Sequence, residues 1–157
     1  TVIAPESNPL IHRSIQRLRT AFGVGLIPTD AGVRPLIREL KAGHCIGLAT
    51  DTRLNTGTLL PFFGRDALTN TTAARLALST GAALVPIHCE RLGDARFHVR
   101  VLPPLWGQVP SGPDPTREGP DPDTLSRQIN QQFEEWIRAT PGQWICLKRR
   151  WPKAHRL

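Results

Sequence analysis

The chain has 157 residues, of which 39% are apolar and 21% charged, and its formal net charge is +7 at pH 7. This length suffices for one domain with a buried core, and no apolar run approaches the roughly 20 residues of a membrane-spanning helix. The excess of Lys and Arg favours an anionic partner such as nucleic acid, anionic lipid or an acidic carrier protein, and a solvated basic surface explains it equally well. The basic residues are spread along the chain without an aromatic and basic RNA-binding signature, so no nucleic acid is expected.

The first part of the chain predicts alternating strands and helices. Residues 2–4 are typical of the end of a strand, and Asn8 followed by Pro9 is typical of a helix start. This helix has apolar residues at helical spacing, namely Ile11, Ile15, Leu18 and Phe22, and Gly23 should end it. A short strand is expected over residues 24–27.

A second helix is expected after Thr29 or Asp30, with Pro35 in its first turn and Gly43 beyond its end. Its apolar stripe should consist of Val33, Leu36, Ile37 and Leu40. Residues 45–50 form a nearly continuous apolar run, which predicts a strand buried between helices in a parallel sheet.

The middle of the chain begins with a polar loop over residues 51–57. An apolar segment over residues 58–63 follows, and Gly64 interrupts it. Thr69 or Asn70 should cap a helix that ends at Gly81. Residues 83–87 predict another buried strand.

The rest of the chain predicts a hairpin, a loop and a helix. Gly93 and Asp94 indicate the turn of an antiparallel pair, whose second strand alternates apolar Phe97, Val99 and Val101 with polar residues. Residues 103–122 are rich in Pro and Gly, which is typical of a surface loop. Asp123 should cap the last helix, Pro141–Gly142 should end it, and residues 143–151 should be extended. The apolar face of this helix should comprise Leu125, Ile129, Phe133, Trp136 and Ile137.

This order predicts an α/β fold with a mostly parallel sheet flanked by helices and one antiparallel strand pair, all in one domain over residues 1–157. The three cysteines are far apart, and two lie in apolar runs, so we expect buried, reduced thiols at Cys45, Cys89 and Cys146. No His or Cys spacing indicates a metal site.

Two segments are candidates for a substrate site. Asp51 follows a predicted buried strand, at the sheet edge where open α/β sheets bind ligands, so Asp51 and Arg53 are candidates to line a cleft. A turn cap or an ion pair explains Asp51 equally well. Phe62, Phe63 and Gly64 have the composition of an apolar acyl pocket wall, although from the residues alone core packing is the preferred interpretation.

The remaining candidates are basic. Arg19 has the chemistry to bind phosphate or stabilise an oxyanion, although a solvated helical arginine is the commoner outcome. None of the five histidines starts an H-x-x-x-x-D/E motif, and His88 in its apolar run is more typical of a core histidine. Cations beside Trp144 and Trp151 suit an anionic membrane surface, nucleic acid phosphates or a solvated tail.

Taken in order, these motifs resemble the bacterial lipid A biosynthesis lauroyl/myristoyl acyltransferase family. The resemblance covers nearly the whole chain and rests on the following pieces, in order: Asn8-Pro9 with Arg13, Arg19 and Gly23; Asp51 and Gly57 before Pro61-Phe62-Phe63-Gly64; Thr69, Ala77, Thr80-Gly81-Ala82 and Val85-Pro86; Glu90-Arg91-Leu92-Gly93; and Asn130, Glu134, Trp136-Ile137-Arg138, Pro141, Gln143-Trp144 and Arg149-Arg150-Trp151. The chain departs from the family pattern at Thr52, Cys146 and Lys148, where Gln, Trp and His are usual.

The resemblance implies a glycerolipid-acyltransferase-like fold and an enzyme of lipopolysaccharide biosynthesis. In this family a His–Asp/Glu dyad activates a hydroxyl of a lipid A precursor, which attacks an acyl thioester on acyl carrier protein. That dyad is absent from this chain, so we expect the chain to be the C-terminal portion of such an enzyme and inactive alone. Arg19 would support catalysis, and the implied substrate-binding residues are Arg19, Asp51, Arg53, Gly57, Phe62, Phe63, Gly64, Arg91, Arg149 and Arg150.

The implied partners are acyl carrier protein, a lipid A precursor and an anionic membrane surface, with no cofactor or metal. The implied location is the cytoplasmic face of the bacterial inner membrane. Two alternatives remain: a glycerol-phosphate-type phospholipid acyltransferase, although residues 51–57 lack the E-G-T-R-like phosphate motif of that class, and a non-catalytic module that binds anionic lipid or nucleic acid.

Overall fold

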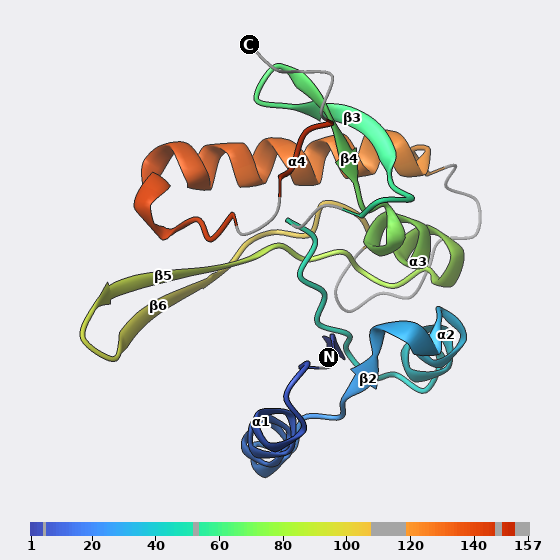
Figure 1. The fold of residues 1–157 in the computed structure, drawn as a ribbon. Helices are drawn as coiled ribbons and strands as arrows, with labels where there is room; N and C mark the ends of the chain where they lie inside the picture. The colour runs from blue at the N-terminus through green and yellow to red at the C-terminus, as the bar shows by residue number, and fades with distance from the viewer. Residues whose placement is uncertain (5, 52–53, 108–118, 147–148, 153–157) are drawn as a thin grey trace. The chain divides into compact units, whose positions relative to one another are not determined.

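The computed structural model describes residues 1–4, 6–51, 54–107, 119–146 and 149–152. Helices and strands are mixed along this part of the chain (Figure 1). The chain divides into two compact units, Thr1–Ala49 and Thr50–Leu157. The strands of the described residues form three separate two-stranded sheets, of which two are antiparallel. The predicted mixture of helices and strands is therefore confirmed, whereas the mostly parallel sheet is not.

The first unit contains a short parallel pair and two helices. β1 (Val2–Ile3) pairs with β2 (Ile27–Pro28), and α1 (Pro9–Ala21) connects them. The Asn8 side chain caps α1 as predicted, because its Oδ1 accepts a hydrogen bond from the Leu10 amide at 3.0 Å. The helix ends before Gly23, whose φ of 72° lies in the left-handed region.

Two predictions in this unit are wrong. Thr29–Ala31 forms a 3-10 helix instead of the start of the second helix, and α2 (Arg34–Lys41) begins only after Gly32, which has a φ of 72°. Residues 45–50 form no strand, and only Thr50 among them is buried. The Gly47 carbonyl accepts hydrogen bonds from the Val2 amide at 3.2 Å and from Thr1 Oγ1 at 3.1 Å, which hold the segment beside β1.

The second unit begins with a tight hairpin. β3 (Thr58–Phe62) pairs antiparallel with β4 (Arg65–Thr69), and Phe62 faces Arg65 at the last rung. Phe63 and Gly64 form the two-residue turn with φ of 52° and 72°, the positive values that a hairpin turn of this length favours. The sequence analysis missed β4, because its R-D-A-L-T sequence has only a short alternation of polar and apolar residues.

α3 (Thr72–Thr80) follows the hairpin. Its N-cap is Thr71, one residue later than predicted, although the Asn70 Oδ1 accepts a hydrogen bond from the Thr72 amide at 2.9 Å. Gly81 ends the helix in the left-handed conformation, as predicted. The buried strand predicted over residues 83–87 is wrong. Leu84 makes only an isolated bridge with Trp106, and Ile87, where the next strand starts, is 59% exposed.

A second antiparallel hairpin joins β5 (Ile87–Gly93) to β6 (Arg96–Val101), so the predicted pair is confirmed. α4 (Pro122–Ala139) is capped by Asp121 and not by Asp123. The Asp121 carboxylate accepts hydrogen bonds from both the amide and the hydroxyl of Thr124, and these bonds lower the pKa of Asp121.

The chain after α4 differs from the extended strand that was expected. Pro141–Gln143 forms a 3-10 helix, and the described residues beyond it form no strand. Most of the predicted loop, residues 108–118, lies outside the described residues. The three cysteines are exposed and form no disulfide, so their predicted burial is wrong. Among the described residues, none of the helices has the length and apolar character needed to span a bilayer.

The core of the second unit lies between the β3–β4 hairpin, α3 and α4, and the hairpin crosses α4 at an angle in Figure 1. Its fully buried apolar residues are Leu60, Phe62, Ala67, Ala74 and Leu125. Polar side chains share this interior, among them Asn130 and Arg150, which are each only 1% exposed. Burial of such groups requires hydrogen-bond partners for them.

Arg150 finds these partners on the hairpin and on α4. Its guanidinium donates to the Leu68 carbonyl, to Thr69 Oγ1 at 3.4 Å and to Asn130 Oδ1 at 3.3 Å. The same group lies over the Phe62 ring, 5.0 Å from its centroid. Asn130 Nδ2 donates in turn to the Pro61 carbonyl and to Thr69 Oγ1, at 3.0 and 3.1 Å. Arg150 therefore ties the end of the chain to both strands and to the helix.

Replacing Arg150 by Met should lower the free energy of unfolding by about 2–4 kcal/mol, because the buried Leu68 and Asn130 oxygens lose a charged donor. The neighbouring Arg149 is exposed, so Arg149→Met should change it by no more than about 0.5 kcal/mol. Chemical denaturation of both variants measures the difference. Equal effects of the two substitutions would contradict a structural role for Arg150.

Candidate active site

The loop that starts at Asp51 rests against the end of β4. The Gly57 amide donates to the Leu54 carbonyl at 2.9 Å, which closes a tight turn. A Cβ at Gly57 would come within 2.5 Å of the Thr69 carbonyl oxygen and 3.0 Å of the Leu54 carbonyl oxygen. Only glycine permits this close approach, so Gly57 fixes the loop by contact with the strand.

Asp51 itself is half-buried and lies near the buried arginine. Burial lowers the pKa of the Arg150 guanidinium, and the neighbouring Asp51 and Cys146 side chains raise it. Arg150 stays cationic, as guanidinium groups do in proteins. Gly57 and Arg150 thus both contact Thr69, and Asp51 is near enough to Arg150 to influence its pKa. Arg53 lies outside the described residues, and its role stays a prediction.

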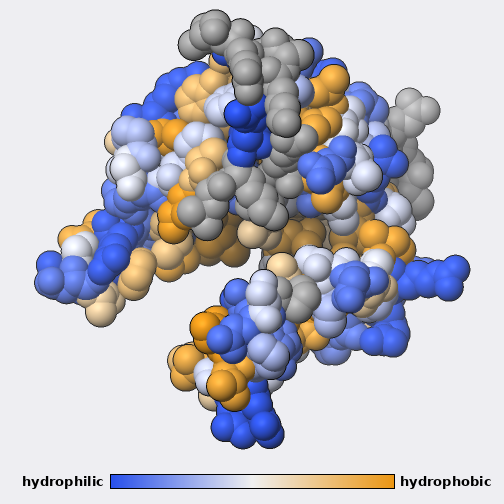
Figure 2. Space-filling model, viewed as in Figure 1, coloured by the Kyte–Doolittle hydropathy of each residue, from blue (hydrophilic) through white to orange (hydrophobic). Residues whose placement is uncertain are grey.

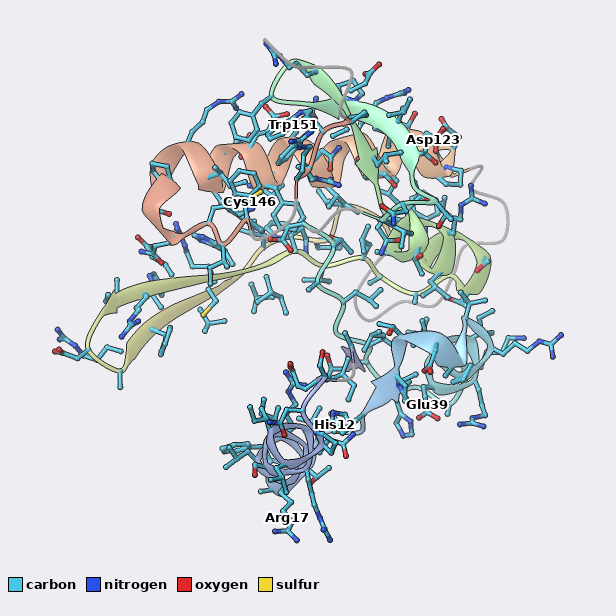
Figure 3. The ribbon with its side chains drawn as sticks, viewed as in Figure 1. His12, Arg17, Glu39, Asp123, Cys146 and Trp151 are labelled. Atoms are coloured by element: carbon cyan, nitrogen blue, oxygen red, sulfur yellow. The ribbon has the colours of Figure 1, made fainter. Side chains whose placement is uncertain are left out.

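The Phe62-Phe63-Gly64 segment divides between the core and the edge of the hairpin. Phe62 is completely buried and packs edge-on against Phe63, with ring centroids 4.9 Å apart. Trp151 covers the same turn, because its Nε1 donates to the Phe62 carbonyl at 3.2 Å (Figure 3). Trp144 completes an aromatic cluster around Phe62, with ring centroids 6.0 Å apart. Phe62 therefore has the role of a core residue, the preferred interpretation of the residues alone.

Phe63 has a backbone conformation that non-glycine residues rarely adopt, with φ at 52°. α4 holds it there, because Glu134 Oε1 accepts a hydrogen bond from the Phe63 amide at 2.7 Å. Glu134 also binds Arg138 Nη2 at 2.6 Å, and the Arg138 guanidinium lies 4.9 Å from the Phe63 ring centroid. This charged pair keeps the half-buried Phe63 ring at the rim of the aromatic cluster.

A row of polar residues on α4 makes the contacts with the β3–β4 hairpin. The sequence analysis did not identify this row as a site. Its members are spaced four residues apart, on one face of the helix: Ser126, Asn130, Glu134 and Arg138. Ser126 and Asn130 are buried, and the last three contact the β3–β4 hairpin. The four-residue spacing of polar residues within a helix that also has an apolar face is the signal that identifies it.

Arg91 is engaged within its own hairpin. Its guanidinium donates twice to the Asp94 carbonyl, at 2.8 and 3.1 Å, and its backbone exchanges two bonds with the Gln143 side chain. Arg149 is exposed. Arg19 is an exposed residue of α1 and belongs to the other compact unit, Thr1–Ala49. Gly57 thus lies at the Thr69 end of the β3–β4 hairpin, Phe63 and Gly64 form the turn at its opposite end, and Phe62 and Arg150 are buried in the core. Arg91 lies in β5, apart from these residues.

His88 is a neutral histidine held by its neighbours. Its ring stacks on Trp136 with centroids 4.6 Å apart, and its Nδ1 lies 3.2 Å from Arg100 Nη2. Burial lowers the pKa of His88, and the charges of Arg100 and His98 lower it further, whereas Glu90 raises it. Because Nδ1 accepts the bond from Arg100, this nitrogen is not available as a base.

Glu39 and His44 form a carboxylate–imidazole contact at 2.8 Å, near the end of α2. The hydrogen bond from His44 lowers the pKa of Glu39. The His44 side chain is 66% exposed, so this contact is a surface ion pair and not a water-excluded dyad. No group of three or more His, Cys, Asp or Glu side chains in the described part of the chain could hold a metal ion.

Comparison with known proteins gives the family. The family model described as bacterial lipid A biosynthesis acyltransferase matches residues 1–153. The phosphatidylinositol mannoside acyltransferase of Mycolicibacterium smegmatis is 29% identical over 154 residues, which cover 95% of this chain and 46% of the relative. The protein of that name from Mycobacterium tuberculosis H37Rv is 30% identical over 155 residues, covering 95% and 44%. The chain thus spans less than half the length of these relatives, and it belongs to the bacterial lipid A biosynthesis acyltransferase family.

Gly57→Ala should destabilise the second unit by about 1–3 kcal/mol, because the added methyl group meets the Thr69 carbonyl. Hydrogen exchange at residues 54–57 should accelerate as the loop lifts away. Gly142→Ala is the matched control, since a Cβ there meets nothing within 4 Å. If both substitutions have the same effect, contact between the loop and the strand does not depend on Gly57.

His88 should titrate below its ordinary pKa of 6.5, and Arg100→Gln should raise its pKa. The folded state disfavours the protonated His88 ring, so the chain is most stable when this ring is neutral. The stability that depends on the neutral ring is fully present above pH 6.5 and is lost as the pH falls below that value. NMR titration of the imidazole protons measures the pKa. A value above 6.5 in the folded chain would show that the ring is free of Trp136 and Arg100.

Proposed function

We propose that this chain is part of an enzyme that transfers a fatty acyl chain from a thioester to a hydroxyl of an anionic glycolipid. The observation that carries the proposal is the family match over residues 1–153, together with about 30% identity to acyltransferases over 95% of the chain. The contacts of the motif residues Gly57 and Arg150 with Thr69, and the effect of Asp51 on the pKa of Arg150, support it.

Two acceptors have support. The relatives named phosphatidylinositol mannoside acyltransferases favour a mannosylated phosphatidylinositol. The family description favours a lipid A precursor. Both acceptors are sugar-containing lipids with phosphate, and the net charge of +7 suits either one. We place the mannosylated phosphatidylinositol first, because that evidence comes from individual proteins aligned over nearly the whole chain.

We assign roles to the candidate residues as follows. Arg19 binds the acceptor phosphate or the oxyanion of the tetrahedral intermediate, and Asp51 with Arg53 shapes the acceptor site. Phe63 and Gly64 lie near the acyl chain. Arg150 is a positioning residue and does not touch the substrate, because it is buried. It binds the β3–β4 hairpin, against which the loop after Asp51 rests. Arg91 and Arg149 are exposed, and we assign them contacts with charged groups of the substrate outside the acceptor site.

The chemical step needs a base, and these residues contain no H-x-x-x-x-D/E motif to supply the one that the family uses. In the proposed reaction, a histidine paired with a carboxylate takes the proton of the acceptor hydroxyl. The oxygen then attacks the thioester carbon, and the thiolate of the carrier leaves. The carrier is acyl carrier protein, and the location is the cytoplasmic face of the inner membrane. General-base catalysis typically supplies ~10²–10⁴ in rate, so residues 1–157 alone should be nearly inactive.

The test uses the complete product of the gene that encodes these residues. It is assayed with labelled acyl chains on acyl carrier protein or coenzyme A, and with mannosylated phosphatidylinositol, a lipid A precursor or glycerol 3-phosphate as acceptor. Transfer to either glycolipid supports the proposal, and preference for the first supports our order. Transfer only to glycerol 3-phosphate, or to none, contradicts it.

In that assay Asp51→Asn should lower kcat/KM by about 100-fold, because a misplaced acceptor loses its alignment with the thioester. Asp94→Asn is the matched control, since this exposed hairpin-turn residue has a φ of 50°, a conformation that Asn also accepts. Equal activity of both variants would remove Asp51 from the site.

A further inference from the structure

α1 has an apolar face that the described residues of the first unit leave largely exposed. The exposed fractions are 77% for Leu10, 52% for Ile11, 64% for Leu18 and 83% for Phe22. At about 100° per residue, these side chains and Ile15 fall within an arc of about 140° on the helix. Figure 2 shows hydrophobic and hydrophilic side chains on different sides of the region that holds α1. Large apolar residues gathered on one exposed face indicate a binding surface.

The charges around this face have one sign. Arg13, Arg17 and Arg19 are exposed, and the sequence of α1 contains no Asp or Glu. Arg17, which extends away from the helix in Figure 3, borders one edge of the apolar arc, and Arg19 borders the other. Among the described residues, no salt bridge engages these three arginines. The surface that covers α1 must therefore be apolar in its centre and anionic at its edges.

We propose that α1 lies in the surface of an anionic lipid bilayer, parallel to the membrane plane. The apolar face would enter the boundary between headgroups and acyl chains, and the arginines would extend to the lipid phosphates. With 13 residues, α1 is about 20 Å long, which provides several lipid contacts without spanning the bilayer.

Other occupants fit this surface less well. Nucleic acid would pair with the arginines but would leave Leu18 and Phe22 against water or phosphate. A second copy of α1 would bring like charges into one interface with no carboxylate to separate them. Anionic lipid satisfies both the apolar face and the charge.

This inference goes beyond the proposed reaction, because it concerns where the chain meets lipid and requires no catalysis. It also gives Arg19 a location consistent with its proposed role. An arginine at the edge of an interfacial helix lies at headgroup level, where the phosphate of a lipid acceptor is found.

The test measures co-sedimentation of residues 1–157 with vesicles of phosphatidylcholine alone, or of phosphatidylcholine mixed equally with phosphatidylglycerol. Binding should require the anionic lipid, and hydrogen exchange should slow at residues 9–22. Arg13→Gln with Arg17→Gln should weaken binding about 25-fold, since each arginine near such a surface contributes about fivefold. Leu18→Ser with Phe22→Ser should weaken it at least tenfold. All four positions are exposed, so the fold should be retained.

Two double variants serve as controls. Arg34→Gln with Lys41→Gln removes the same charge from α2, and Val99→Thr with Val101→Thr reduces exposed apolar surface on β6. Both should bind as the unchanged chain does. The proposal is overturned if the chain ignores anionic vesicles or if the controls weaken binding as much as the α1 variants. It is also overturned by salt-dependent binding to duplex DNA alone, or by self-association that Leu18→Ser with Phe22→Ser abolishes. Because no acyl donor is present, these outcomes are independent of the acyl-transfer assay.

Discussion

The buried guanidinium of Arg150 is the constraint on which the second unit depends. A charged side chain that is 1% exposed is costly unless its environment supplies acceptors, and here they come from two separate segments. Leu68 and Thr69 contribute from β4, and Asn130 contributes from α4. Because these acceptors surround the guanidinium only if both segments are in place, Arg150 couples its own segment to the hairpin and the helix.

The candidate site depends on the same arrangement. Gly57 can contact the Thr69 carbonyl only because β4 is held in position, and this contact sets the course of the loop that carries Asp51. On the other side of the hairpin, Glu134 and Arg138 hold Phe63 in its unusual backbone conformation. Residues of the family motifs therefore differ in role. Arg150 and Phe62 are buried and stabilise the hairpin, whereas Asp51 and Phe63 are half-buried.

Local signals in the sequence predicted local structure well. Asn8 and Gly23 bounded α1, Gly81 ended α3, and Gly93-Asp94 identified the β5–β6 turn, because caps and turns depend on a few neighbouring residues. The apolar runs over residues 45–50 and 83–87 were misread as buried parallel strands, since an apolar run does not specify what pairs with it or covers it. The site was predictable only in part, because Arg150 reads as one more basic residue until long-range contacts bury it beside Asn130.

A double-mutant cycle between Arg150 and Asn130 tests the central claim most directly. Arg150→Met, Asn130→Leu and the double variant would be compared by their free energies of unfolding. If the two residues act as one buried unit, the double variant should lose about 1–3 kcal/mol less than the sum of the single losses, because each single substitution leaves the other polar group unsatisfied. Single losses that add within about 0.3 kcal/mol would show that the two side chains are independent, and would contradict the account.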